Sequence, residues 1–233
     1  MATPLCETSG VIEPVVSAAD FVVHEYYDQG KIVIRSAASP VSLQANTVRK
    51  KQFRAAFGAA VQEATRGIFT HDVEVTLVWL IEEARRYQTH LVADLDNVLK
   101  PLLDAITGPG GVFIDDNQVQ SIRASWMTPG AGGPGFELTI EALMGDDYVE
   151  RAGLSFVEFS ADRCYMLHGG LGPWEARVVA QFRRMVAAYH SELAMGFAED
   201  VARMILPIAR PFPRARLGRF RVRHESEFPD PDS

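Results

Sequence analysis

The chain has 233 residues, of which 47% are hydrophobic, enough for one large core or for one domain with a substantial extension. It contains no run of about 18 or more apolar residues, which excludes a membrane-spanning helix. Its first ten residues lack the basic start and apolar run of a secretory signal. The formal net charge of −7, taken as an average, argues against a polyanionic partner.

The charge is unevenly distributed along the chain. Residues 201–224 contain seven arginines and no acid, whereas the last nine residues contain four acids. The first 200 residues are therefore more acidic than the average suggests. This separation is compatible with metal binding in one region and phosphate binding in another.

The two cysteines, Cys6 and Cys164, form neither a disulfide framework nor a metal-ligand spacing. We interpret them as unpaired thiols. Such thiols fit a reducing cytosol, so a cytoplasmic location is expected.

In chain order, residues 1–29 have weak periodicity, and we interpret them as an N-terminal extension. The β-branched run 31–35 predicts a strand, and apolar residues at helical spacing predict a helix over 47–66. Regular alternation of apolar side chains over 73–81 predicts a second strand.

A second helix is predicted at about 97–107, followed by a Gly-Pro-Gly-Gly turn at 108–111. Residues 119–126 and 136–143 predict two further strands. The order β-α-β-α-β-β predicts an α+β fold over residues 30–145, with helices packed on a small mixed sheet.

The chain then changes character. Residues 146–170 are irregular, with one predicted strand over 154–159, and two apolar stripes predict two helices within 173–209. We therefore divide the remainder into a mainly helical extension, 146–209, and an arginine-rich then acidic tail, 210–233.

Clustered aspartates stand at the start of the second predicted helix. Pro101 is tolerated only near a helix start, so this helix is expected to begin close to Asn97. In an extended segment Asp94 and Asp96 would lie on one side of the chain, just before a helix N-terminus that favours anions. Lys100 lies one helical turn beyond Asp96, on the same face.

These residue types suit phosphodiester cleavage. Mg²⁺ takes oxygen ligands, polarises the phosphoryl oxygen, activates water and stabilises the leaving oxygen, and a lysine can neutralise the charge that develops. The local pattern leaves three other interpretations open. Asp94 and Asp96 can be helix caps, Lys100 can pair with Asp104, and the acid pair at 115–116 can form a turn.

The longer pattern is more specific. The run D-L-D-N-V-L-K-P-L-L-D-A-I-T-G at 94–108, followed by V-F-I-D-D-N-Q-V at 112–119, resembles the signature of RusA-type Holliday-junction resolvases. That family comprises small metal-dependent endonucleases that act as homodimers on branched DNA. The resemblance covers about half of the chain. The matched positions are Asp94, Asp96, Asn97, Lys100, Asp104, Asp115 and Asp116.

The resemblance implies roles for these residues. It makes Asp94, Asp96 and Asp116 the catalytic ligands of Mg²⁺ or Mn²⁺, and Lys100 the catalytic lysine. Neighbouring side chains of an extended segment point in opposite directions, so only one of Asp115 and Asp116 is expected to face the metal.

The sequence departs from the family pattern in two places. Typical members carry a basic run before the first aspartate, where this chain has a weaker positive patch at 82–90, and they lack residues 146–233. Two other cationic groups are candidate nucleic-acid contacts. They are Arg49, Lys50, Lys51 and Arg54 in the first helix, and Arg214, Arg216 and Arg219 in the tail. The competing interpretations are a solvated helix face and a tail that docks on the body or on a dimer partner.

The leading hypothesis is a Mg²⁺- or Mn²⁺-dependent, structure-selective endodeoxyribonuclease that acts on branched DNA, including Holliday junctions. It is expected to be a homodimer with no membrane partner. Two alternatives remain open. One is a nuclease that acts on flaps, forks or RNA, and the other is a resolvase-derived binding or regulatory protein that does not cleave.

Overall fold

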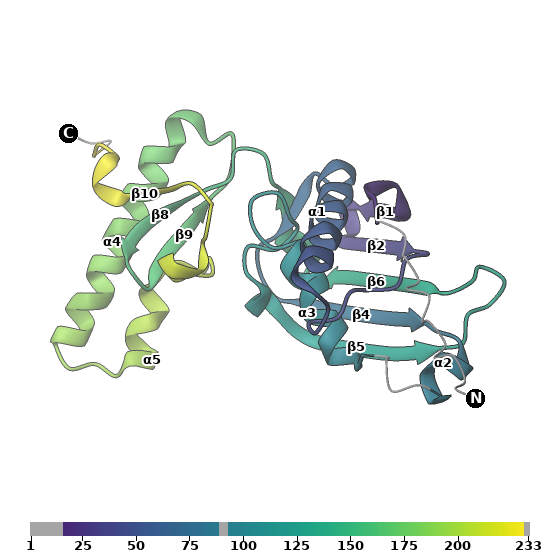
Figure 1. The fold of residues 1–233 in the computed structure, drawn as a ribbon. Helices are drawn as coiled ribbons and strands as arrows, with labels where there is room; N and C mark the ends of the chain where they lie inside the picture. The colour runs from purple at the N-terminus through teal and green to yellow at the C-terminus, as the bar shows by residue number, and fades with distance from the viewer. Residues whose placement is uncertain (1–15, 89–92, 231–233) are drawn as a thin grey trace, which may run out of the picture.

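The computed structural model describes residues 16–88 and 93–230 (Figure 1). Two parts of the chain lie side by side. The N-terminal part, residues 16–150, is built on a five-stranded sheet, and the C-terminal part, residues 151–230, on a three-stranded sheet.

The five-stranded sheet is mixed and has the order β1-β2-β6-β4-β5. Within it β4 and β5 run parallel, and the other neighbouring strands are antiparallel. Its strands are β1 (Phe21–Tyr26), β2 (Lys31–Ser36), β4 (Val73–Leu80), β5 (Val119–Met127) and β6 (Gly135–Ala142). The α+β class is confirmed, and each strand predicted between residues 30 and 145 is present.

The assignment of residues 1–29 to an extension is wrong for β1. This strand pairs with β2 along its whole length and forms one edge of the sheet. Of its residues only Phe21 is buried, so the segment lacks the apolar alternation that marks an inner strand. The residues before 16, which include Cys6, lie outside the described residues, as does the end of the patch at 82–90.

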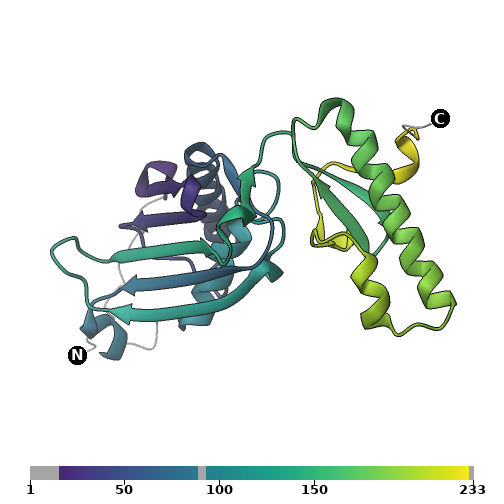
Figure 2. The ribbon, with the colours of Figure 1, turned by 180° about the vertical axis from the view of Figure 1, so that it is seen from behind.

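Two helices cover one face of the sheet, and the opposite face, seen from behind in Figure 2, carries no helix among the described residues. They are α1 (Thr47–Ala64) and α3 (Leu95–Ala105). Their buried side chains join those of the sheet in one core, in which Phe57 and Leu102 of the helices and Leu77 of β4 are fully buried. The short helix α2 (Glu83–Gln88) follows β4.

Two short strands lie where the N-terminal part meets the C-terminal part. They are β3 (Gly67–Phe69) and β7 (Tyr148–Glu150), and they pair antiparallel. Phe69 also forms a parallel bridge with Phe113, two residues before the acid pair at 115–116. This segment is therefore held directly beside β3.

The C-terminal part combines helices with a sheet of order β10-β8-β9. Its elements are β8 (Ser155–Ser160), β9 (Arg163–Leu167), α4 (Glu175–Ala194), α5 (Glu199–Ala202) and β10 (Val222–His224). The helical content and the strand predicted at 154–159 are confirmed. Strands β9 and β10 were not predicted. Burial does not alternate regularly along β9, and β10 spans only three residues within the predicted tail.

The tail packs into a core instead of extending into solvent. Phe212, Leu217 and Phe220 are buried in one cluster together with Ile68 and Ile114 of the N-terminal part. The interpretation of the tail as an element that docks on the body therefore agrees with the structure. This cluster fixes the C-terminal part against the segment that carries the acid pair.

The second apolar stripe of the sequence is not part of a core. Phe197 and Met204 are 51% and 83% exposed, because the regular helix α5 spans only four residues there. In residues 16–88 and 93–230, no helix is both long and apolar enough to cross a bilayer.

Candidate functional site

The aspartates of the sequence pattern lie at the start of α3. The helix begins at Leu95, with Asp94 as its N-cap residue and Asp96 in its first turn. The expected start near Asn97 is therefore two residues late. The expected extended pair is also wrong, because Asp94 has extended backbone angles whereas Asp96 is already helical.

Neither of these two carboxylates is engaged in a helix cap or an ion pair among the described residues. The side chain of Asp94 makes no capping hydrogen bond. Within the described residues, neither Asp94 nor Asp96 takes part in an ion pair, and both are exposed. Their position at a helix N-terminus, where the backbone N–H groups point outward, stabilises their negative charge.

Lys100 is the centre of the site. Its Nζ lies 2.7 Å from Oδ1 of Asp104, one turn further along α3, and it donates a hydrogen bond to Oδ2 of Asp116. Arg54 of α1 pairs with the other oxygen of Asp104. Hydrogen bonds to Asp104 and then to Asp116 raise the pKa of Lys100, so the lysine is held in its charged form.

A tight turn returns the chain to Lys100 after α3 ends. The N–H of Gly111 donates to the carbonyl of Gly108, and the N–H of Val112 donates to that of Ile106. Gly108 has φ of 106°, and a Cβ at Gly111 would lie 1.9 Å from the carbonyl oxygen of Ile106, so both positions require glycine. This turn brings Asp116 within reach of a lysine 16 residues earlier.

The acid pair is fixed by a buried glutamine. Oε1 of Gln118 accepts hydrogen bonds from the backbone N–H groups of Ile114 and Asp115, at 2.8 and 3.0 Å. Its Nε2 donates to the carbonyls of Phe69 and His71, at 2.8 and 3.0 Å. Gln118 is completely buried, so these four bonds hold the acid pair rigidly against β3 and the residues that follow it.

Both acids of the pair lie near the same cationic side chain, that of Arg216 from the C-terminal part. Nη1 of Arg216 lies 3.3 Å from Oδ2 of Asp115 and 3.9 Å from Oδ1 of Asp116. Both acids can contact one arginine because Asp116 begins the 3₁₀ helix η3 (Asp116–Gln118), so the segment is not an extended strand. The expectation that only one of the two acids faces the metal stays a prediction.

The two acids have opposite electrostatic surroundings. The hydrogen bond from Lys100 lowers the pKa of Asp116. Burial, followed by the contact with Asp116, raises the pKa of Asp115, whereas the charge of Arg216 acts to lower it. Asp115 is only 6% exposed, and its Oδ2 accepts no hydrogen bond from any of the described residues. It is thus a buried carboxylate whose charge is incompletely compensated.

The predicted cage of three aspartates is not seen. Within residues 16–88 and 93–230, no three His, Cys, Asp or Glu side chains form a group that could hold a metal ion. Lys100 and Arg216 instead lie on the acids at 115–116. The assignment of Asp94, Asp96 and Asp116 as ligands therefore stays a prediction.

The chemistry of the donors nevertheless fits a hard cation. The carboxylates of Asp94 and Asp96 have no partner within the described residues, and the buried Oδ2 of Asp115 accepts no hydrogen bond. Oxygen donors of this kind are the ligands that Mg²⁺ and Mn²⁺ prefer. Asp115, which the sequence analysis left outside the ligand set, is thus a further candidate.

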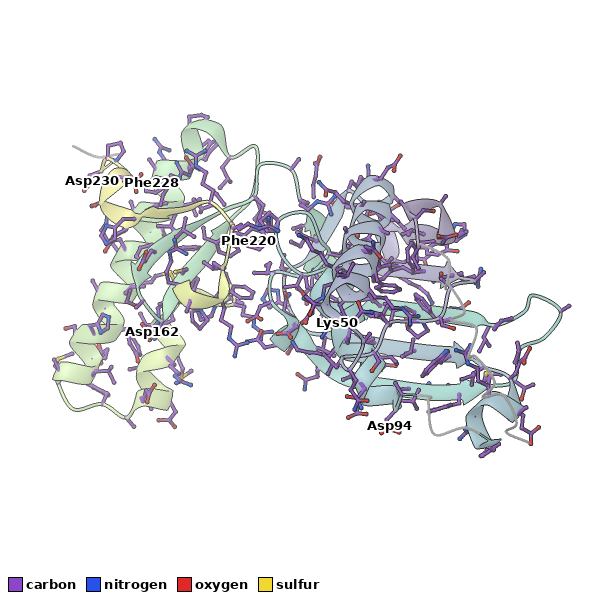
Figure 3. All side chains as sticks on the ribbon, in the orientation of Figure 1. Lys50, Asp94, Asp162, Phe220, Phe228 and Asp230 are labelled. Atoms are coloured by element: carbon purple, nitrogen blue, oxygen red, sulfur yellow. The ribbon has the colours of Figure 1, made fainter. Side chains whose placement is uncertain are left out.

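The cationic residues proposed as nucleic-acid contacts differ in how far their side chains are already engaged within the protein. On α1, Lys50 donates to the carbonyl of Leu43 at 2.8 Å, and Arg54 is paired with Asp104. Lys51 is exposed, and Arg49 is also engaged in an interaction. Figure 3 shows Lys50 and Asp94 on the N-terminal part. The α1 candidates are therefore only partly available to a ligand.

In the tail, Arg214 lies 3.6 Å from Glu158, whereas Arg219 is exposed without a partner among the described residues. Of the seven candidate nucleic-acid contacts, Arg54 reaches Asp104 and Arg216 reaches the acid pair. The sequence carried no signal for the contact of Arg216, because 101 residues separate it from Asp115. It also carried none for Gln118, a polar residue of a turn.

The fold and the site define an α+β protein in which a helical lysine and several carboxylates meet, an arrangement suited to phosphoryl-transfer chemistry. Residues 33–141, slightly less than half of the chain, match the sequence model of the family described as Endodeoxyribonuclease RusA, so this segment is similar to that family. The match runs from β2 to β6. It includes α3 and the acid pair, and leaves β1 and the C-terminal part outside. No curated protein matches the chain.

Proposed function

We propose that the protein is a metal-dependent, structure-selective endodeoxyribonuclease that hydrolyses phosphodiester bonds in branched DNA, including Holliday junctions. The observation that supports this function most directly is the contact of Lys100 with Asp116, within the segment that matches the RusA family. The contact joins the two acidic segments of the sequence pattern, which are remote along the chain.

The residues of the site divide the work as follows. Asp94, Asp96 and Asp116, with Asp115 as a further oxygen donor, hold Mg²⁺ or Mn²⁺. The metal supplies activation of water and stabilisation of the leaving oxygen. Lys100, kept charged by its acidic neighbours, binds the phosphoryl oxygens and stabilises the charge that develops on them. Asp104 and Arg54 orient the lysine.

Two copies of the chain would match the symmetry of the substrate. A four-way junction has two-fold symmetry, so a C2 homodimer places one site on each of two strands. Cleavage at both strands of one junction requires this pairing, whereas cutting of a single strand does not. We therefore include the homodimer in the proposal.

The test is cleavage of a labelled synthetic four-way junction beside a linear duplex of the same sequence, with and without Mg²⁺. We expect cutting of the junction alone, and only with the metal. Asp96→Asn is expected to lower the cleavage rate by at least about 10²-fold, the usual effect of losing one electrostatic group of an active site, while junction binding survives. The exposed Asp146 is a matched control, and Asp146→Asn should cut normally.

The alternatives give different results in the same assay. Preferred cutting of flaps, forks or RNA would keep the enzyme class and change the substrate. Junction binding without cutting would favour a binding or regulatory protein. One observation favours that function, because Lys100 pairs with Asp116 and Arg216 pairs with Asp115. Normal cutting by Asp96→Asn would contradict the assigned site.

A further inference from the structure

We propose that the C-terminal part completes the nuclease site within one chain, and that Arg216 is the residue it supplies to bind a phosphate of the DNA strand. The proposal rests on the proposed function and adds to it a residue from outside the segment that matches the RusA family.

Arg216 is held in place by its neighbours. It ends the 3₁₀ helix η7 (Arg214–Arg216), and Leu217, the next residue, is 1% exposed. Leu217, Phe212 and Phe220 lie in the cluster that also contains Ile114, the residue directly before Asp115. The same apolar contacts therefore position both Arg216 and the acid pair, so their separation is fixed by packing and not by the ion pair alone.

The cluster that positions Arg216 lies where the two parts of the chain meet. Phe220 lies on the side of the C-terminal part that faces the N-terminal part (Figure 3). The two backbone hydrogen bonds between Phe212 and Cys164, each of 2.9 Å, tie this segment to the beginning of β9. The arginine thus projects from an ordered element of the C-terminal part, as a binding residue requires.

The guanidinium group of Arg216 retains capacity for a ligand. A guanidinium has five N–H donors, and within residues 16–88 and 93–230 the contacts of Arg216 use one nitrogen, Nη1. The side chain of Arg216 is 51% exposed, whereas the side chain of Asp115 taken alone is 8% exposed. Arg216 therefore presents free donors to solvent beside a buried carboxylate, and planar pairs of N–H donors match the oxygens of a phosphate.

A second arginine of the C-terminal part shows what a structural ion pair looks like in this protein. Arg183 donates from Nε to Glu225 at 2.7 Å and from Nη2 to the carbonyl of the same residue at 2.7 Å. The contact of Arg216 with Asp115 is 3.3 Å, longer than a close charge-assisted hydrogen bond. Arg183 thus makes short hydrogen bonds that hold two segments of the C-terminal part together. Arg216 is oriented by the acids but makes no comparably short bond with them.

The neighbouring arginines extend the cationic surface beyond the site. Arg219 and Arg221 are exposed, and neither has a side-chain partner among the described residues. They follow Arg216 on the segment that leads into β10. A DNA strand whose scissile phosphate reaches Lys100 and Arg216 would meet further positive charge along this segment, which compensates for the weak basic patch before Asp94.

The experiment compares Arg216→Gln, Arg216→Lys and a control, Arg203→Gln, with the wild-type protein. Arg203 is an exposed arginine of the same part, paired with Glu199. Four-way junction affinity is measured without divalent metal at several salt concentrations, and cleavage is measured with Mg²⁺. Urea unfolding of each variant establishes that the fold is retained.

We expect Arg216→Gln to reduce the slope of log K against log salt concentration by about 0.9, the contribution of one phosphate contact. Its kcat should fall by about 10²-fold, with the control unchanged in both. Arg216→Lys should keep the slope, since it keeps the charge, and recover only part of kcat, since it loses the planar pair of donors.

Each other result is decisive. Faster cutting by Arg216→Gln would show that the arginine blocks the acid pair from binding metal, and this result would overturn the proposal. An unchanged slope and kcat in that variant, with active wild-type protein, would overturn the proposal while leaving the nuclease function intact. Wild-type protein that neither binds nor cuts any branched DNA would overturn both.

Discussion

The backbone N–H of Leu43 donates a hydrogen bond of 2.8 Å to the carbonyl oxygen of Asn97. Asn97 lies four residues before Pro101, which is inside α3 and has no N–H to offer that carbonyl. Leu43 therefore takes the place of the missing helical donor, and α3 continues through the proline to Ala105. The loop before α1 thus stabilises the helix that carries Lys100.

The first prediction concerns Pro101. Proline in a helix interior usually costs about 3 kcal/mol relative to alanine. Because Leu43 already satisfies the carbonyl of Asn97, Pro101→Ala should change the free energy of unfolding by less than about 1 kcal/mol. Urea denaturation measures this difference. As a control, Gln52→Pro places a proline at an exposed interior position of α1 and should cost about 3 kcal/mol. A gain near 3 kcal/mol for Pro101→Ala would contradict the role given to Leu43.

The second prediction concerns Gln118. Gln118→Leu removes four hydrogen bonds and leaves two buried N–H groups and two carbonyls without their partner. Each such group costs about 1–3 kcal/mol, although relaxation and water recover part of it, so we expect a loss of at least about 3 kcal/mol in unfolding free energy. Cleavage should fall as well, since the acid pair loses its support.

The exposed neighbour Asn117 provides the matched control for this variant. Asn117→Ala should leave the unfolding free energy within about 0.5 kcal/mol of wild type, as surface substitutions usually do. Equal stability of Gln118→Leu and Asn117→Ala would show that the buried amide does not fix the acid pair.

The third prediction concerns the charge of Asp116. The hydrogen bond from Lys100 lowers the pKa of Asp116 below its usual value of 3.8, and Lys100→Met should return that pKa toward 3.8. Carbon NMR titration of the aspartate carboxyl groups measures the shift. Lys31 of β2 pairs in the same way with Glu141 of β6 and does not act on Asp116, so Lys31→Met should leave the pKa of Asp116 unchanged.

The sign of the pH dependence follows from linkage. A carboxyl whose pKa is lowered by folding stabilises the protein above its unfolded pKa, and this contribution is lost as the pH falls through the folded pKa. The stability difference between wild type and Lys100→Met should therefore be largest above pH 3.8 and shrink as the pH falls through the lowered pKa of Asp116. A difference that grows on acidification would contradict the assignment.

Part of the fold and of the candidate site could be predicted from the sequence alone. The apolar periodicity of α1 and β4 predicted both elements, since one face of each is buried in the main core. The helical spacing of Lys100 and Asp104 indicated that these two side chains could pair, and they do. Local patterns of this kind survive folding because neighbours along a helix remain neighbours in space. The convergence of Asp94, Asp96 and Asp116, which the signature implied, stays a prediction.

What the sequence could not predict depends on contacts between distant segments. The start of α3 was misplaced because Pro101 was expected to need a helix N-terminus, and its actual support comes from Leu43. The contact of Arg216 with Asp115 joins positions 101 residues apart. The tail was expected either to bind phosphate or to dock on the body or a dimer partner, and the burial of Phe212 and Phe220 against the N-terminal part shows that it docks on the body.

The last prediction tests whether the tail is a structural element. Phe212 is 2% exposed, contacts the ring of Phe156 at a centroid distance of 5.8 Å, and pairs through its backbone with Cys164. Phe212→Ala should cost about 3–5 kcal/mol, the usual loss for a buried phenylalanine, whereas Phe197→Ala, at a half-exposed position, should cost less than about 0.5 kcal/mol.

Cys164 supplies a local readout of the same change. Burial raises the pKa of the Cys164 thiol to about 11, so the folded protein should resist alkylation at this position at pH 8. Phe212→Ala should speed alkylation of Cys164, located by peptide mass spectrometry, because it opens the cluster that covers the thiol. Equal alkylation rates in the Phe212 and Phe197 variants would mean that the tail does not seal this core. In that case Arg216 would lack the rigid seat on which its proposed phosphate contact depends.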